Sequence, residues 1–295
     1  MTIICATHFT DTSLEAVKVA AQLARTHREA LWLLNVMPHA ATAGGEDDVA
    51  VTGALLTEAS RLAREGLVVN TATVFGPLMK AVKEVCEAKR ASLLVVGDVD
   101  QTLAPLVVGP LDRFADNIGV PALIVRKADS FLKWASGAAP LKVAMAMDGN
   151  WKSAAAREWI IRLASYGPIE LVASYLWWPR DEAKPKSWAK VTPRLEADTS
   201  FTRLPSNVRY RVRLEVGDAK VGTRLLARAQ ADEADVFVVG THAHRGPRGQ
   251  QWSVSHEVLA TAPMSVACVP DAAARLAAAP ASPATQSDLL RIVAN

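Results

Sequence analysis

Short apolar runs alternate with longer amphipathic stretches along the first half of the chain. Apolar runs fall at 3–7, 31–36, 68–75, 92–97 and 122–125, and stretches with helical spacing fall at 13–27, 49–65, 77–89 and 111–118. Continuous apolar strands separated by amphipathic helices are typical of a parallel sheet covered on both faces. Right-handed crossovers then predict an α/β, doubly wound, five-stranded sheet with strand order 3-2-1-4-5.

The start of the first helix has a capping signal. Thr12 and Glu15 are three residues apart, the spacing of a capping box, in which the two residues satisfy each other's backbone N–H groups. The sequence therefore predicts that this helix begins at about Ser13.

The second half repeats the first. The segment 3–9 resembles 143–149 at an offset of 140 residues, and 91–97 resembles 234–240 at an offset of 143. The matches keep their order, which indicates a tandem duplication. We expect one domain over residues 1–139, a second over 140–270, and an Ala/Pro-rich tail over 271–295.

The second copy departs from the first where the second helix would fall. Residues 177–207 hold several tryptophans and prolines, and prolines 179, 185, 193 and 205 exclude a long regular helix. We favour tryptophans that pack against the sheet or the other copy; stacking on a base is the alternative. The strand after this loop alternates strictly, with Arg209, Arg211 and Arg213 on one face. This pattern predicts a half-exposed edge strand, whose arginines are solvated or contact an anion or acidic partner.

Composition excludes several classes of protein. Half of the 295 residues are hydrophobic, 21% are charged and the net charge is only +3, which argues against disorder and against a dedicated nucleic-acid binder. No apolar run reaches the roughly 18 residues of a membrane helix, and the N-terminal segment lacks the features of a signal peptide. Cys5, Cys86 and Cys268 lie in separate apolar stretches, as buried thiols would. These features predict a cytoplasmic protein without membrane or nucleic-acid partners.

Candidate chemistry lies where strands one and four of the second copy end, beside the switch point of the sheet. Asp148 follows the first strand, and a glycine-containing loop between Gly240 and Ser253 runs into a helix. Backbone N–H groups, the helix dipole and arginines would form a phosphate cradle. The candidate binding residues are Asp148, Gly240, Thr241, His242, Arg245, Gly246, Ser253 and Val254.

Each candidate has a simpler structural interpretation. Asp148 could cap the next helix, and Gly240 could be a turn residue. His242, His244 and His256 lack further ligands for a metal, so we expect none. Ser253 with His256 and Glu257 has the composition of a nucleophile and base, but spacing along a helix produces such neighbours without a catalytic triad.

With these motifs, residues 1 to about 270 resemble a tandem universal stress protein. The resemblance rests on the duplicated domain, the Asp148 after a strand, and the strand-Gly240-Thr241-His242 segment followed by Ser253 and Val254. In nucleotide-binding members the motif is Gly-x-x-Gly, nine residues, then Gly-Ser/Thr. The resemblance implies an adenine-nucleotide site, ATP or another, in which Asp148 and the backbone at Leu176 hold the adenosine.

Both copies depart from that motif. In the second, Ala243 replaces a glycine and Trp252 replaces another, where an indole would obstruct the outer phosphates. In the first, His8 replaces the acidic residue, Asp98 and Asp100 place negative charge after strand four, and Pro110 replaces the serine. We therefore expect a degenerate site in the first copy and a weak or altered one in the second.

Three functions remain as hypotheses. The first is a non-enzymatic, cytoplasmic stress-response regulator; the alternatives are an interaction module that binds no nucleotide and an enzyme acting on an adenylated substrate.

The resemblance also implies that the fifth strands 122–125 and 265–269 pair within the chain about a pseudo-twofold axis, since exposed apolar edges aggregate. A homodimer and an unidentified protein partner stay open. In the tail, 287–293 is either a docked helical turn or frayed.

Overall fold

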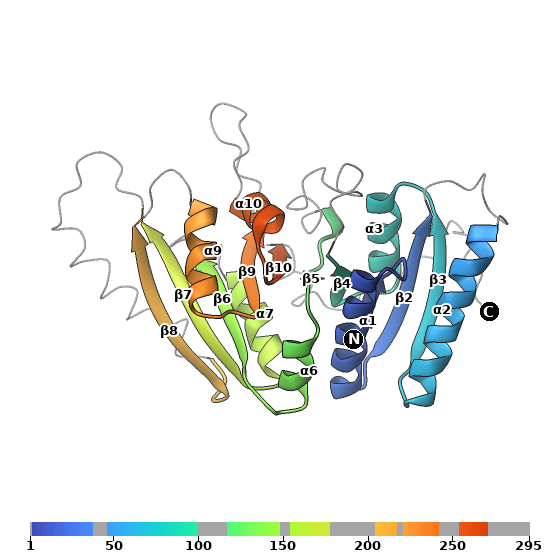
Figure 1. Cartoon of the computed structure of the whole chain (residues 1–295), viewed down its shortest axis with the longest axis horizontal. Coiled ribbons are helices and arrows are strands. Elements are labelled where there is room, and N and C mark those ends of the chain that lie inside the picture. Colours follow the sequence, from blue (N-terminus) through green and yellow to red (C-terminus); the bar gives the residue numbers. More distant parts are fainter. Residues whose placement is uncertain are drawn as a thin grey trace.

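The computed structural model describes residues 2–37, 46–98, 117–147, 154–177, 204–216, 221–241 and 254–270. Its strands form one ten-stranded sheet in the order β3-β2-β1-β4-β5-β10-β9-β6-β7-β8, with β3 and β8 at opposite edges (Figure 1). The order within each half is therefore 3-2-1-4-5, as predicted. The predicted pair of sheets is one continuous sheet because its two halves join edge to edge.

The first half supplies five strands and the helices between them. Its elements are β1 (Thr2–Ala6), α1 (Asp11–His27), β2 (Ala30–Met37), α2 (Glu46–Arg64), β3 (Val69–Phe75), α3 (Leu78–Ala88), β4 (Leu93–Gly97), β5 (Ala122–Val125) and α6 (Asp129–Ala135). The second half consists of β6 (Leu141–Met147), α7 (Ala154–Ala164), β7 (Ile169–Trp177), β8 (Val208–Val216), α9 (Val221–Ala231), β9 (Val236–Thr241), α10 (Val254–Thr261) and β10 (Ser265–Pro270). Residues 111–116 of the predicted helix 111–118, residues 178–203 of the predicted loop 177–207 and the tail 271–295 lie outside the described residues, and residues 117 and 118 are helical.

The two halves meet at their fifth strands. β5 and β10 are antiparallel, and Leu123 pairs with Ala267 at the middle of the three aligned positions. All other neighbouring strands in the sheet are parallel. The prediction that these two apolar edges cover each other is confirmed, because all four residues of β5 and all six of β10 are buried.

Both faces of the sheet are covered by apolar side chains from both halves. One cluster joins Val17 of α1 to Trp159 of α7, and the other joins Val82 of α3 to Val258 of α10. The three cysteines are buried in these clusters as predicted. Burial raises the pKa of the Cys86 thiol to about 12, and it also raises the pKa of Cys5.

The first turn of α1 differs from the predicted one. Thr10 is the N-cap residue: its hydroxyl accepts a hydrogen bond from the Ser13 backbone N–H at 3.4 Å, and its carbonyl accepts one from the Ser13 hydroxyl at 2.9 Å. The predicted capping box of Thr12 and Glu15 was wrong. Thr12 already lies in the helix, and the Glu15 carboxylate accepts a hydrogen bond from the backbone N–H of Ala128 instead.

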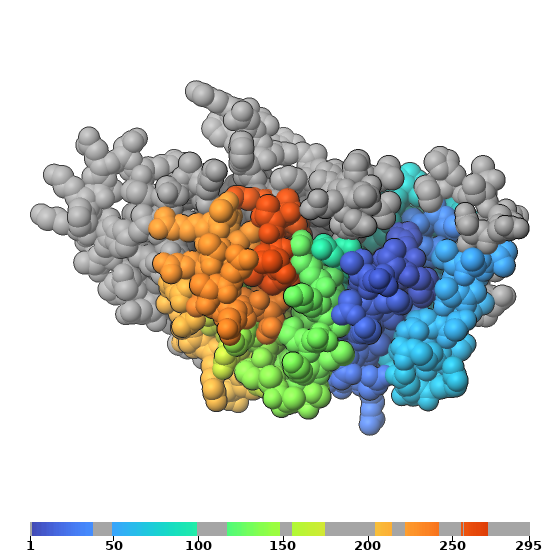
Figure 2. Space-filling view, viewed as in Figure 1, coloured from blue at the N-terminus to red at the C-terminus, as the bar shows by residue number. Residues whose placement is uncertain are grey.

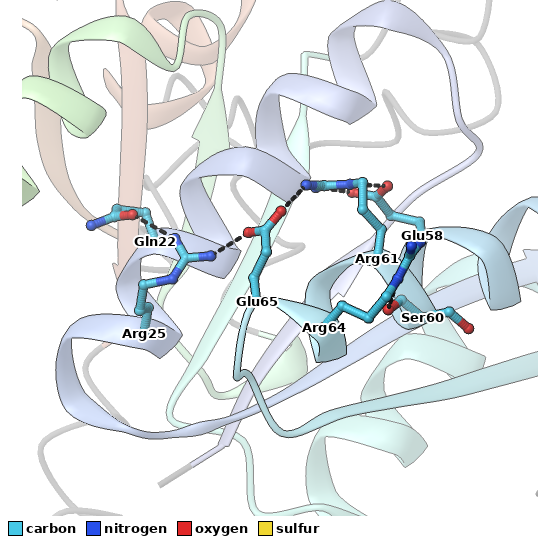
Figure 3. Close-up of polar contacts among 7 residues, drawn as sticks. All are labelled: Gln22, Arg25, Glu58, Ser60, Arg61, Arg64 and Glu65. Carbon is cyan, nitrogen blue, oxygen red and sulfur yellow. Dashed lines mark hydrogen bonds and ion pairs between the residues drawn. The ribbon is translucent and has the colours of Figure 1, made fainter.

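A chain of charged groups ties the last turns of α1 and α2 together (Figure 3). Arg25 on α1 lies 2.6 Å from the Glu65 carboxylate, which also pairs with Arg61 on α2. Arg61 in turn makes two contacts to Glu58, at 2.6 and 2.9 Å. These groups are largely exposed, so the network orients the helix ends and contributes modestly to stability.

Helix α6, which the sequence pattern did not predict, connects the halves. Its Phe131 and Trp134 side chains are buried, and in Figure 2 the green residues around it lie between the blue first half and the orange second half. Seven residues are too few for a clear periodicity, although Phe131 and Trp134 have helical spacing. Among the helices that the structure describes, none is both long and apolar enough to cross a membrane.

Candidate functional site

The strand order reverses at two places, beside β1 and β4 in the first half and beside β6 and β9 in the second. In the second half, Gly240 and Thr241 end β9, and β6 ends at Met147, immediately before Asp148. Leu176 is the next-to-last residue of β7, the other neighbour of β6, and Val254 begins α10. The strands β6, β7 and β9 run parallel, so Leu176, Gly240 and Thr241 lie on the same side of the sheet, where the carboxyl ends of these strands meet.

Several predicted site residues lie outside the part of the chain that the structure describes. They are Asp148, His242, Arg245, Gly246 and Ser253. Of those it describes, Thr241 is 1% exposed and Gly240 is half-buried. The nucleotide site therefore stays a prediction, and the described residues position two of its strand ends.

The corresponding place in the first half is filled by its own polar side chains. The buried Thr7 hydroxyl donates a hydrogen bond to the Ser13 hydroxyl at 3.1 Å and accepts one from the Phe9 backbone N–H at 3.1 Å. This arrangement holds the segment after β1 against the first turn of α1. His8, which stands where the second half has Asp148, is exposed.

Gly97, at the end of β4, allows that turn to approach the sheet. A Cβ atom on Gly97 would lie 2.6 Å from the carbonyl oxygen of Thr12 and 2.7 Å from the Cα of Ser13. Both are backbone atoms, so no side-chain rotation would make room. In the first half, backbone atoms of α1 therefore lie directly against the end of β4.

A carboxylate follows Gly97 and is partly neutralised. Asp98 lies 3.4 Å from the guanidinium of Arg126, whose Nη2 also donates a hydrogen bond to the carbonyl of Leu259 at 3.0 Å. The Arg126 backbone N–H donates to the Ser265 hydroxyl at 3.1 Å. Arg126 thus links the strand end of the first half to α10 and β10 of the second.

The strand registers identify the second-half equivalent of Asp98. Gly97 pairs with Val125, and Gly240 pairs with Val269, which aligns Asp98 with Thr241. At the position aligned across the fourth strands, the first half therefore carries a carboxylate and the second half a neutral side chain. This difference supports the prediction that a site for an anionic ligand is more degenerate in the first half.

Comparisons with known proteins agree with this fold. Residues 1–126 match the model of the Universal stress protein family. These residues form a universal stress protein domain. A search among curated protein sequences found no significant match.

Solved structures extend the likeness over both halves. A universal stress protein from Archaeoglobus fulgidus DSM 4304 superposes with a TM-score of 0.66 at 14% identity, covering 91% of this chain and 96% of that one. A functionally unknown protein from Pseudomonas aeruginosa PAO1 superposes with a TM-score of 0.65 at 18% identity, covering 93% and 95%. At these identities the likeness is one of fold, so the second half shares the architecture of the universal stress protein domain before it.

One functional-looking residue has a structural role that the sequence did not reveal. The Glu257 carboxylate accepts hydrogen bonds from the backbone N–H groups of Gly222 and Thr223 at 3.1 and 2.9 Å, and from the Thr223 hydroxyl at 2.5 Å. It therefore caps the N-terminus of α9 and neutralises the positive end of its dipole. A Cβ atom on Gly222 would lie 2.5 Å from this carboxylate, which explains the glycine. The interpretation of Glu257 as part of a nucleophile-and-base group is unnecessary.

Within the described ranges, no group of three or more His, Cys, Asp or Glu side chains could hold a metal ion.

The arginines of the edge strand β8 form ion pairs with carboxylates. Arg209 lies 3.7 Å from Glu170, and Asp232 accepts from both Arg211 and Arg213 at 2.6 and 2.8 Å. The prediction of a half-exposed edge strand is confirmed, since Val208 is buried on the opposite face of β8 from these arginines.

Proposed function

We propose that this chain is a non-enzymatic stress-response regulator of the universal stress type, whose adenine-nucleotide site lies in its second half. The family match over residues 1–126 and the shared fold of the second half support the general class. The proposed domains keep the boundaries 1–139 and 140–270. A cytoplasmic location and a role in stress signalling through a protein partner belong to the same proposal.

We place the nucleotide site in the second half because Thr241 stands there at the position that Asp98 occupies in the first half. Two unit negative charges 4 Å apart repel by about 4 kcal/mol at an effective dielectric constant of 20, so a carboxylate at a strand end disfavours a phosphate there. Arg126, which pairs with Asp98, also donates a backbone hydrogen bond to Ser265 where the two halves meet. Thr241 has no such charge, and its position leaves the second switch point compatible with an anionic ligand.

The proposed site consists of Asp148 and the backbone at Leu176 for the adenosine, and the loop from Gly240 to Val254 for the phosphates. Within this loop, Thr241, His242, Arg245, Gly246 and Ser253 supply N–H, hydroxyl and guanidinium donors. The loop leads into α10, whose N-terminal dipole would attract an anion. Trp252 stands in the loop where close backbone approach favours glycine, and we expect it to weaken triphosphate binding.

Calorimetric titration of the full chain with ATP, ADP and AMP tests this proposal. We expect Asp148→Ala to weaken nucleotide binding about tenfold, the effect of losing one hydrogen bond to a charged group. The matched change His8→Ala, at the equivalent position of the first half, should leave binding unchanged. Trp252→Gly should strengthen ATP binding more than AMP binding.

Other results would redirect the proposal. Binding that responds to His8→Ala and not to Asp148→Ala would move the site to the first half and overturn the assignment. Absence of heat with all three nucleotides would favour an interaction module that binds no nucleotide. Turnover of an adenylated substrate by the purified chain would favour an enzyme.

A further inference from the structure

The duplication provides an internal comparison for a surface away from the strand ends. Trp32 on β2 pairs with Ile4 of β1, and Val172 on β7 pairs with Ala144 of β6. Ile4 and Ala144 occupy the same position in the two halves, so Val172 is the equivalent of Trp32. An indole in the first half is thus replaced by a much smaller side chain in the second.

The residue that follows the helix over this sheet position also differs between the two halves. Lys89 follows α3 and its ammonium lies 4.0 Å from the centroid of the Trp32 ring, a cation–π contact. Asp232 follows α9 at the equivalent place, and each is followed by a residue with positive φ, Arg90 at 49° and Glu233 at 52°. A left-handed residue therefore follows the helix at the same position in both halves, but the indole ring is present only in the first.

A groove lies at this place in the second half. It has a volume of about 400 Å³, and its lining includes Ala144, Val172 and Asp232. Ala144 precedes Asp148 by four residues, which is about 13 Å along the strand. The groove is therefore separate from the proposed nucleotide site, and the inference goes beyond the proposed function.

The rim of the groove is positively charged on one side. Arg209 and Arg211 line it together with Glu170 and Asp232, and Lys142, which also lines the groove, pairs with Glu233 at 2.6 Å. The Arg209 side chain is 87% exposed and its contact with Glu170 is long, at 3.7 Å. Asp232 is shared between Arg211 and Arg213, so this group of three keeps a net positive charge. An anionic group at the rim would gain charge-assisted hydrogen bonds there.

We propose that this groove binds a small planar aromatic carboxylate. Its ring would lie on Ala144 and Val172, in the place that the Trp32 indole fills in the first half, and its carboxylate would pair with Arg209 at the rim. The shape is taken from the internal copy, and the charge from the arginines of β8.

Titration of the full chain with indole-3-carboxylate, followed by calorimetry and by ligand-observed NMR, tests the proposal. We expect saturable binding of one molecule per chain. Val172→Trp should abolish binding, because it restores the indole that fills this place in the first half. Ala144→Leu also fills the groove and is the second variant in case Val172→Trp fails to fold. We expect Ala144→Leu to weaken binding at least tenfold.

Charge selectivity provides the matched controls. Arg209→Gln should weaken binding of indole-3-carboxylate at least about tenfold, the loss expected for one charge-assisted hydrogen bond. Arg64→Gln, an exposed arginine on α2, should have no effect. Tryptamine, which carries a positive charge on a similar ring, should bind at least tenfold more weakly than the carboxylate.

Three results would overturn the proposal. They are no saturable binding at millimolar ligand, equal binding of tryptamine and the carboxylate, and binding that both filling variants leave intact. Asp148→Ala should leave indole-3-carboxylate binding unchanged. That variant separates failure of this inference from failure of the nucleotide assignment.

Discussion

At the scale of single residues, Gly97 controls how closely the end of β4 and the first turn of α1 can pack. We expect Gly97→Ala to destabilise the protein by about 1–3 kcal/mol, because the new methyl would overlap backbone atoms of Thr12 and Ser13. Gly53→Ala is the matched control: no atom lies within 4 Å of its Cβ position in α2. That change should stabilise the helix by up to about 1 kcal/mol.

Urea unfolding followed by circular dichroism would measure both changes. Opposite signs for the two glycines would show that the close approach at the first switch point, and not glycine flexibility in general, determines the cost. Equal and small effects would contradict the packing at Gly97.

At the scale of elements, a carboxylate on α1 holds the start of α6. The Glu15 carboxylate accepts from the Ala128 backbone N–H at 2.9 Å and pairs with Lys18 at 2.5 Å. The hydrogen bond from Lys18 is the main reason that the pKa of Glu15 is lowered, with a further contribution from Ala128. A lowered pKa in the folded state stabilises the protein above the unfolded pKa of 4.5, and this stability is lost as the pH falls through the folded value.

We therefore expect Glu15→Gln to lower stability at pH 7 by less than about 1 kcal/mol, because the Glu15 carboxylate is partly exposed and solvent screens its ion pair. The difference from the unchanged protein should shrink between about pH 5 and pH 3, as Glu15 becomes protonated. Thermal melts across this range measure it. Glu158→Gln on the exposed surface of α7 is the control, and a pH-independent deficit for Glu15→Gln would argue against the charge as its cause.

At the scale of the whole molecule, the two halves share both of their hydrophobic clusters. The cluster around Val17 continues to Trp159, and the one around Val82 continues to Val258, with the β5–β10 pairing between them. We expect one cooperative unfolding transition, in which neither half unfolds alone. In scanning calorimetry, the calorimetric and van't Hoff enthalpies should agree. Two resolved transitions would mean that the seam is weaker than the halves it joins.

The periodic pattern of the sequence by itself determined the architecture. Apolar strands alternating with helices predicted the strand order, and the repeat predicted a second copy. The family resemblance, together with the apolar runs at 122–125 and 265–269, predicted the pairing of the halves. The alternation around Arg211 predicted an edge strand. These features depend on short-range periodicity and on which faces must be buried, and both are present in a linear sequence.

Contacts between distant residues were decided only by the tertiary structure. The hydrogen bonds from Gly222 and Thr223 to Glu257 span about 35 positions, and that from Ala128 to Glu15 spans 113. Thr10, and not Thr12, is the N-cap residue of α1, because the extended backbone that precedes the helix falls at Thr10. The groove beside Val172 lies at the position where the first half has the larger Trp32 side chain. Periodicity states which face a residue occupies, but packing decides which atoms meet there.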